Sequence, residues 1–344
     1  MSLIFAEGFG MNLGATQLGR KFTTASGTVD TRVTGYKDHG YALSSTNATL
    51  RTPDFTQQNT WVLGCALWWA TRTASVGSKI EFLLAGAAQL TFEVVFDEDG
   101  NTFTIDVKRG STTLDTVGPF FAREPAYYEF KATVRTLTNG SWEIKRDGVS
   151  AGSGSATNTA DQGSDGCDGF KVTFDSPGAT MRFVDLYIVD DQGAIRNDYL
   201  GPTKVLSLRP SADGADSDWA PSSGSDHYAL VDDPANNPSD TTRVTSFTAN
   251  DIDLYAYEDL DLPSGITVLG VVVESVVSME ASGSRTLRAK YRNAGDTRSN
   301  GSNETVSTTA WQWIAQIWEQ DPIAASDWTK ALVDAAQFGI EVVS

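Results

Sequence analysis

The feature that most constrains this chain is an alternation of apolar and polar residues with a period of two. Such runs occupy 90–97, 103–108, 128–135 and 170–175, and another returns at 287–292. Side chains of a β-strand point to opposite faces in turn, so each run gives one apolar and one polar face. This pattern is typical of antiparallel sheets that pack one face against a core.

The residues between these runs favour tight turns. Asp99-Gly100, Asn139-Gly140 and Asp147-Gly148 follow or separate the strand-like segments. These dipeptides tolerate the positive φ angles that short hairpins require. With almost no helical periodicity between the strands, the sequence predicts an all-β fold of two antiparallel β-sandwiches.

The chain of 344 residues is long enough for two domains. Gly201-Pro202 marks the predicted boundary, because Pro cannot donate to a sheet ladder and Gly weakens one. We therefore expect a first domain over 1–201 and a smaller one over 202–344. Two segments rich in Ser, Asp, Asn and Gly or Pro, 150–169 and 211–240, are expected to be loops.

The second half contains four further expected elements. Val268–Val277 is almost wholly apolar and suits a central strand buried on both faces, and Trp311–Trp318 suits a tryptophan-rich strand. A short helix is expected near 326–337, with Asp327 as its N-cap. The chain then yields a closing strand at 338–343.

Charge and composition exclude several classes of function. The chain carries 26 Lys+Arg against 44 Asp+Glu, a formal charge of −18, which argues against nucleic-acid binding. Two His and two Cys argue against His-rich metal sites and multi-Cys zinc sites. We expect no secretory signal in MSLIFAEGFG and no membrane insertion, because no apolar run reaches about 18 residues.

The two cysteines, Cys65 and Cys167, leave two alternatives. They could close a disulfide loop, or they could be separate thiols in a protein assembled in a reducing cytosol. The second alternative is preferred, because the sequence gives no reason to place the sulfurs together.

Enzymatic activity is not expected. A glycosidase needs two carboxylates across a sugar-sized cleft, and no clustered acidic strand motif is present, since Asp97–Gly100 has the character of a hairpin turn. A serine triad needs a His base, but His39 lies in a turn. His227 has Ser222, Ser223 and Asp226 nearby, yet neighbours along one loop rarely converge, so a structural hydrogen bond is preferred for it.

Exposed tryptophans are the candidate contacts for a glycan or a neighbouring subunit. Adjacent strand residues face opposite ways, so one of Trp68 and Trp69 is expected in the core and the other outside. Trp311 and Trp313 share a face, with Trp318 on the other. Burial in the core or in a subunit interface is the alternative, because Trp buries a large area.

No cofactor is expected, and calcium is kept as an alternative because hard cations favour carboxylate-rich loops. Neither candidate loop matches the regular calcium-binding pattern. The candidate ligands are Asp161, Asp165, Asp168, Asp213, Asp216 and Asp218.

Several strings resemble known families. Leu3–Phe9 is similar to the first strand of laminin-G-like and concanavalin-A-like domains, and Arg182–Ile188 to their last strand. The resemblance implies a concanavalin-A-like jelly roll over the first domain.

A second resemblance extends over most of the chain. The strings LRPSADG (208–214) and SSGSDHY (222–228), with 198–202, 231–234 and the ending around 317–340, resemble a family of tailed-bacteriophage and prophage virion proteins. This resemblance implies a structural or surface component of a phage head or tail, assembled in the bacterial cytoplasm, and brings no catalytic residues.

Together these expectations favour a non-enzymatic virion protein, a decoration, spike or tail-associated component. It would dock onto other virion proteins as a homo-oligomer, a trimer by preference. The alternative is an adhesin whose jelly roll binds a host-surface glycan, and a depolymerase is less favoured. An adhesin should show an outward aromatic ring at the rim of the first domain, lined by Asn, Asp and Gly.

Overall fold

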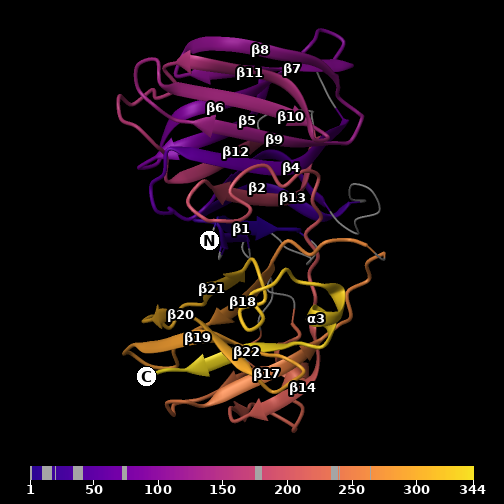
Figure 1. The fold of residues 1–344 in the computed structure, drawn as a ribbon, viewed down its shortest axis with the longest axis vertical. Coiled ribbons are helices and arrows are strands. Elements are labelled where there is room, and N and C mark those ends of the chain that lie inside the picture. The colour runs from indigo at the N-terminus through magenta and orange to yellow at the C-terminus, as the bar shows by residue number, and fades with distance from the viewer. Residues whose placement is uncertain are drawn as a thin grey trace. The chain divides into compact units, whose positions relative to one another are not determined.

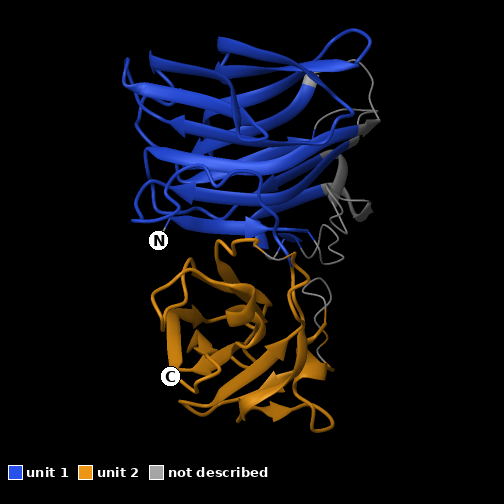
Figure 2. Ribbon diagram, turned by 45° about the vertical axis from the view of Figure 1, so that its right-hand side comes forward, with its two compact units in different colours: residues 1–206 blue, residues 207–344 orange. Residues whose placement is uncertain are grey.

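The chain divides into two compact units, residues 1–206 and 207–344 (Figure 2). The expected boundary at Gly201-Pro202 lies a few residues before this division. The computed structural model describes residues 2–9, 18–19, 21–33, 42–71, 76–174, 180–233, 239, 241–263 and 265–344.

Among the described residues, the first unit has one sheet of thirteen antiparallel strands. Most of these strands are labelled in Figure 1. The strands are β1 (Leu3–Glu7), β2 (Thr24–Val33), β3 (Ala42–Arg51), β4 (Thr60–Thr71), β5 (Val76–Leu84), β6 (Ala87–Phe96), β7 (Thr102–Arg109), β8 (Thr112–Phe121), β9 (Ala126–Thr133), β10 (Gly140–Arg146), β11 (Val149–Thr157), β12 (Gly169–Phe174) and β13 (Thr180–Asp190). The hydrogen-bonded order is β11-β10-β9-β4-β13-β3-β12-β5-β6-β7-β8, with β1 on β13 and β2 on β3.

This sheet folds back on itself to make two layers. Phe92 on β6 meets Phe130 on β9 with ring centroids 5.0 Å apart, and Trp69 on β4 meets Phe103 on β7 at 4.6 Å. These strands are far apart in the hydrogen-bonded order, so their apolar faces enclose a common core. The alternating runs of the first unit therefore form strands with one face in the core, as predicted, and the all-β fold class is confirmed.

The second unit contains smaller antiparallel sheets. Its elements are β14 (Pro210–Ser217), β15 (Ala220–Pro221), α2 (Tyr228–Val231), β16 (Val244–Thr245), β17 (Ile252–Tyr257), β18 (Val271–Val277), β19 (Arg285–Arg292), β20 (Arg298–Val306), β21 (Gln312–Trp318), α3 (Lys330–Asp334) and β22 (Gln337–Val342). The order β14-β17-β22-β19-β20 forms one sheet, and β18-β21 and β15-β16 form two-stranded ribbons. Val273 and Trp318 of the β18-β21 ribbon share a core cluster with Tyr291 and Phe338 of the five-stranded sheet.

Several expectations about individual elements were wrong. Both predicted loops contain a strand, β11 in the first and β14 in the second. Both strands are rich in Ser, Ala and Gly or Asp, and both lie at the edge of a sheet. An edge strand pairs its backbone on one side only, and these two strands do so without a row of apolar side chains. The run 268–277 is not a central strand, because β18 pairs with β21 alone.

The predicted helix is shorter than expected. It spans Lys330–Asp334, and its N-cap is Thr329, whose side chain accepts a hydrogen bond from the Leu332 N–H, rather than Asp327. The Trp311–Trp318 and closing strands are confirmed as β21 and β22.

Cys65 and Cys167 are separate free thiols, as the preferred alternative states, and both of them are buried rather than one. Burial raises the pKa of each thiol well above its ordinary value. Within the described part of the chain, the helices are too short or too polar to cross a bilayer.

Candidate functional site

The adjacent pair Phe120 and Phe121 ends β8 with one ring inside and one outside. Phe120 is 8% exposed and packs on Phe103 and Tyr128, whereas Phe121 is 64% exposed. Phe121 lies directly opposite Thr102 on β7, so both side chains leave the sheet on its outer face. The first unit therefore presents an aromatic ring to solvent at the end of a strand.

The hairpin between β6 and β7 borders this ring with Asp, Gly and Asn. The Ala122 N–H donates to the Asn101 carbonyl at 3.0 Å, which fixes the hairpin beside the end of β8. Asp99 accepts hydrogen bonds from the Asn101 backbone at 2.7 Å and from its amide at 2.6 Å. Asp97 accepts from the Thr102 hydroxyl at 2.5 Å. These carboxylates are held in place at the surface.

The residues that follow Phe121 are tied to the β10–β11 turn, where the Arg146 guanidinium lies 5.7 Å from the centroid of the inward Phe120 ring. The Glu124 N–H donates to the Phe121 carbonyl at 3.4 Å, and Arg146 bonds the Glu124 carboxylate at 2.6 Å. Val149, three residues beyond Arg146, is 70% exposed. We call these segments, 97–102, 121–124 and 146–149, the Phe121 rim. It combines an exposed ring with fixed carboxylate and amide groups of the β6–β7 hairpin.

The outer face of β12, β5, β6 and β7 carries a second polar surface. Opposed side chains form ion pairs there: Lys171 with Glu81 at 2.8 Å, Lys79 with Glu93 at 3.1 Å, and Lys108 with Glu93. Burial raises the pKa of Glu93, but hydrogen bonds and charge from Lys108 and Lys79 outweigh it and hold the pKa below its ordinary value. We call this surface the paired-charge face. Its acids are engaged by lysines.

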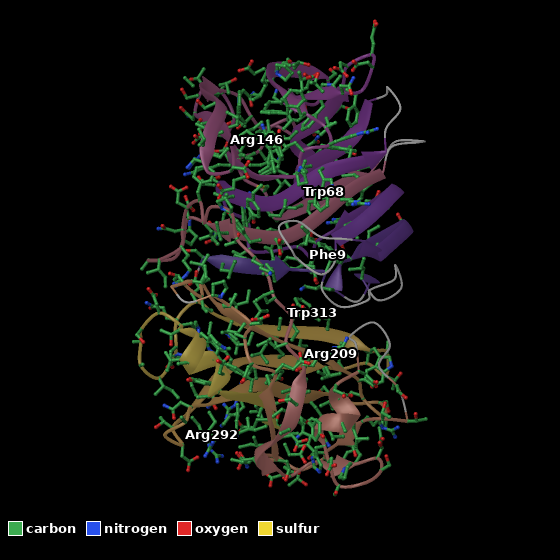
Figure 3. All side chains as sticks on the ribbon, turned by 90° about the vertical axis from the view of Figure 1, so that its right-hand side faces the viewer. Phe9, Trp68, Arg146, Arg209, Arg292 and Trp313 are labelled. Carbon is green, nitrogen blue, oxygen red and sulfur yellow. The ribbon has the colours of Figure 1, made fainter. Side chains whose placement is uncertain are left out.

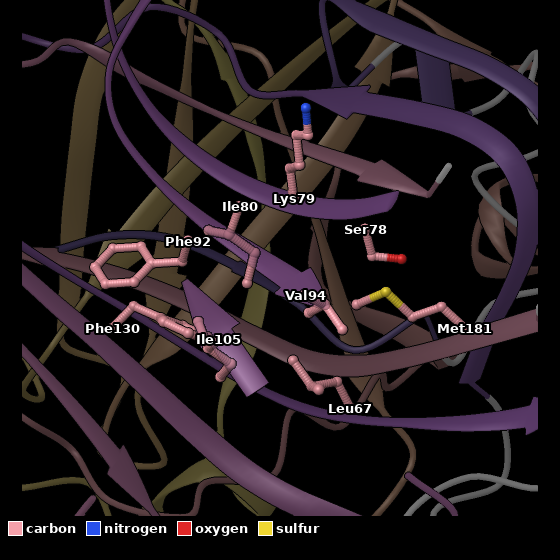
Figure 4. Close-up of a pocket in the computed structure, with 9 residues that line it drawn as sticks. All are labelled: Leu67, Ser78, Lys79, Ile80, Phe92, Val94, Ile105, Phe130 and Met181. Atoms are coloured by element: carbon pink, nitrogen blue, oxygen red, sulfur yellow. The ribbon is translucent and has the colours of Figure 1, made fainter. Parts of the chain in front are cut away.

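A small cavity lies beneath this face, between the two layers of the first unit (Figure 4). It is lined mainly by apolar side chains, including Leu67, Phe92, Phe130 and Met181, with Ser78 and Lys79 at one side. An apolar gap with so few polar groups offers little to orient a ligand, so we regard it as a feature of core packing.

The four predicted tryptophans do not form one site. Trp68 and Trp69 are 5% and 1% exposed, so neither ring is open to solvent, contrary to the expected division of one inside and one outside. Trp69 packs on Phe96 at 5.2 Å, and the Arg182 guanidinium lies over the Trp68 ring at 5.9 Å. Figure 3 labels Trp68 among the side chains of the first unit and Trp313 among those of the second.

In the second unit, Trp311 and Trp313 are half-buried near the start of β21. Trp318 lies in the core, which agrees with the predicted separation of faces. Contact roles for Trp311 and Trp313 stay predictions.

The six predicted metal ligands serve as hydrogen-bond acceptors and ion-pair partners. Three of them accept hydrogen bonds from backbone N–H groups: Asp168 from Ala85, Asp213 from His227 and Tyr228, and Asp218 from Ile252. Asp165 accepts from Thr136 and pairs with Arg135, and Asp216 pairs with Arg298. Asp161 accepts from the side chain of Gln162. Among the described residues, no group of three or more His, Cys, Asp or Glu side chains could hold a metal ion. Calcium stays an alternative without a described ligand set.

His227 belongs to a buried network and not to a serine triad. Its Nδ1 lies 3.0 Å from both carboxylate oxygens of Asp253, and the Tyr255 hydroxyl donates to the same carboxylate at 2.6 Å. Burial raises the pKa of Asp253 and, with the charge of Asp253, that of Tyr255. Ser222 instead donates to the Thr241 carbonyl. The expected structural hydrogen bond of His227 is confirmed, and His39 lies outside the described residues.

No protein-family model matches the chain, and no curated protein matches it either. Solved structures do match its N-terminal part, which has a concanavalin-A-like jelly-roll likeness.

The alginate lyase Aly36B matches with 11% identity over 56% of this chain and 98% of its own, at a TM-score of 0.39. The CBM2 module of the evolved Dit of Lactobacillus casei BL23 phage J-1 matches with 15% identity over 55% and 95%, at 0.37. The Caenorhabditis elegans galectin LEC-6 matches with 13% identity over 40% and 88%, at 0.28. At these values the likeness concerns the fold and carries no activity over to this chain.

Proposed function

We propose that this protein is a non-enzymatic contact component of a tailed-phage particle and that its first unit binds a glycan at the Phe121 rim. The phage part of the proposal is supported by the strings at 208–214 and 222–228. The glycan part is supported by one observation, the 64% exposed Phe121 ring beside the Asp97–Asn101 hairpin. This is the arrangement that the adhesin hypothesis requires.

The chemistry of the rim suits a neutral sugar. An exposed aromatic face packs against the apolar C–H face of a pyranose, while fixed carboxylate and amide groups accept and donate hydrogen bonds to its hydroxyls. The hairpin carries Asp97, Glu98 and Asp99 on a chain of charge −18, so anionic sugars would be repelled. We therefore propose a neutral or amino-substituted host-surface glycan as the ligand.

A role in contact is preferred over polysaccharide cleavage. Glycoside hydrolysis needs two carboxyl groups about 5–9 Å apart across a sugar, free to transfer protons or attack. The acids of the paired-charge face, Glu81 and Glu93, are engaged by Lys171, Lys79 and Lys108. On the rim, Asp97 and Asp99 are held in place by hairpin hydrogen bonds, and their remaining lone pairs can accept from sugar hydroxyls without a proton transfer.

A glycan array with the full chain tests the proposal. Wild-type protein should bind a subset of neutral envelope glycans, and Phe121→Ala should lose that binding. Leu137→Ala is the matched control, because Leu137 is equally exposed at 72% but follows the far end of β9 from the rim. Equal binding by wild type and Phe121→Ala, or binding to none of the glycans, would exclude the rim as a glycan site.

Docking onto a neighbouring subunit is the second candidate, because the rim also exposes Val149. In that case Phe121 would be covered in a homo-oligomer, a trimer by preference, or against another virion protein. Analytical ultracentrifugation separates the two: Phe121→Ala and Val149→Ser should dissociate an oligomer if they dock and leave the mass unchanged if they bind glycan. A reconstruction of the intact particle would then show whether the rim faces solvent.

A further inference from the structure

The outer face of the five-stranded sheet in the second unit brings together an amine, a carboxamide and a carboxylate. Lys290 on β19 donates from Nζ to Oδ1 of Asn300 at 2.7 Å and to Oε2 of Glu341 at 2.7 Å. The three residues come from three neighbouring strands, β20, β19 and β22. Lys290 is 8% and Glu341 3% exposed, so the amine is largely removed from water.

The register of the strands builds this contact. Lys290 lies directly opposite Asn300, and two residues of β20, Gly301 and Ser302, face the single residue Ala289. Such a bulge re-aims the side chains beside it and is frequent next to reactive sites. Directly opposed Cβ atoms are only about 5 Å apart, so the longer lysine side chain can reach the amide carbon of its partner.

A third group fixes the carboxylate. Arg288 bonds Glu341 through two nitrogens, Nη2 to Oε1 at 2.8 Å and Nε to Oε2 at 3.0 Å. This fork holds Oε2 toward Nζ of Lys290. The carboxylate is therefore positioned to take a proton from the ammonium group, which must be lost before the nitrogen can act as a nucleophile.

We propose that Lys290 and Asn300 form an intramolecular isopeptide bond between β19 and β20, with Glu341 carrying the proton. Nζ gives one proton to Glu341 and its lone pair forms a bond to Cγ of Asn300. The Cγ–Nδ2 bond then breaks, and Nδ2 leaves as ammonia after taking the second Nζ proton. Glu341 finally gives its proton to the ammonia. In total, an ammonium and a carboxamide become a secondary amide and an ammonium ion, with no oxidant or cofactor.

The bond would act on an exposed edge. β20 is the outermost strand of its sheet, and its strand positions 302–305 are exposed. An edge strand can peel away from its neighbour, and a covalent link to β19 prevents that separation. The link closes a short loop, so it pins β20 without fixing the rest of the unit.

Mass spectrometry of the full-length protein tests the proposal. Purified wild-type chain, sampled over several days, should come to be lighter by one ammonia, and digestion should release a branched peptide joining Lys290 to Asn300. Lys290→Arg and Glu341→Gln should abolish the ammonia loss. Asn303→Ser is the matched control on the same strand, opposite Arg288, and should keep it.

Two results overturn the proposal. The first is a wild-type chain that keeps its full mass and yields only linear peptides. The second is conversion of Asn300 to aspartate, which would show that the Gly301 nitrogen and then water, and not Lys290, attack the amide. The digest of the wild-type chain tests for the cross-link even if Glu341→Gln fails to fold. Asn300→Ser, at an exposed position, is a second variant that lacks the reacting amide and should keep its full mass.

Discussion

The two units bury their polar groups in different ways. In the first unit the space between the layers is filled by rings, such as Phe92 against Phe82 and Phe130. Its buried carboxylates Glu129 and Asp185 accept hydrogen bonds from the backbone of the segment 201–205. In the second unit Asp253 is fully buried on a central strand and is bonded by His227 and Tyr255. The first unit therefore uses its buried carboxylates to hold the segment that follows its last strand, whereas the second unit uses one to bind side chains to a strand of its sheet.

Truncating a ring in the core of the first unit should cost the most stability. Phe92→Ala removes a ring that is 1% exposed and leaves a cavity between the layers. We expect a loss of about 3–5 kcal/mol in the free energy of unfolding of the first unit. Hydrogen exchange in urea, followed on peptides of each unit, measures it. Loss of protection in β17 and β22 but not in β6 and β9 would contradict the assignment.

The next effect concerns the buried network of the second unit. Asp253→Ala leaves the His227 and Tyr255 side chains without their shared acceptor, which costs about 2–3 kcal/mol because both are desolvated. Hydrogen exchange should show the loss in β17 and β22. Ser217→Ala is the control, since Ser217 lies opposite Asp253 on the exposed strand β14. A loss no larger than the control would mean that the network adds no stability.

A smaller loss of stability is expected where hydrogen bonds hold residues 200–205 against the first sheet. The Tyr127 hydroxyl lies 2.9 Å from the Asp185 carbonyl and 2.8 Å from the Thr203 hydroxyl, while Gly201 donates to Glu129 at 2.8 Å. Tyr127→Phe should cost about 1 kcal/mol and raise exchange in residues 200–205. Unchanged exchange there would show that other contacts fix this segment.

The smallest effect is one of pH. Ion pairs hold the pKa of Glu93 below its ordinary value of 4.5. A lowered carboxyl pKa contributes stability above the unfolded value, and this contribution is lost as the pH falls through the folded value. Wild type should therefore lose stability on acidification below about pH 4.5, and Glu93→Gln should lose less. Denaturation in urea from pH 7 to pH 3 measures the difference, and parallel curves would contradict the prediction.

The same comparison explains what could be predicted from the sequence. In the first unit the alternating runs at 90–97 and 128–135 became β6 and β9, because nothing polar interrupts their inner faces. In β17, Asp253 and Tyr255 share the face that would carry apolar residues, so the alternation that identifies a strand is lost. Edge strands such as β11 show no alternation either, because both of their faces are largely exposed.

The outward ring of the first unit belongs to a different aromatic pair from the one that the sequence analysis names. Trp68 and Trp69 face opposite sides of β4, but both sides are covered. The same alternation applied to Phe120 and Phe121 places one ring outside. The signal was Gly118-Pro119 before the pair and an Asp-Gly hairpin nearby, which together mark the end of a strand, where one side is open. Contacts such as Lys290 with Asn300 depend on register, which the sequence did not fix.

The central claim is contact without cleavage at the Phe121 rim. It is tested most directly by light scattering with size-exclusion chromatography, using a neutral polysaccharide retained on the glycan array and mixed with wild type, Phe121→Ala or Leu137→Ala. We predict that wild type and Leu137→Ala co-elute with polysaccharide of unchanged length, and that Phe121→Ala binds at least about tenfold more weakly, a loss of about 1.4 kcal/mol. Shortened polysaccharide, or equal binding by Phe121→Ala, would contradict the claim.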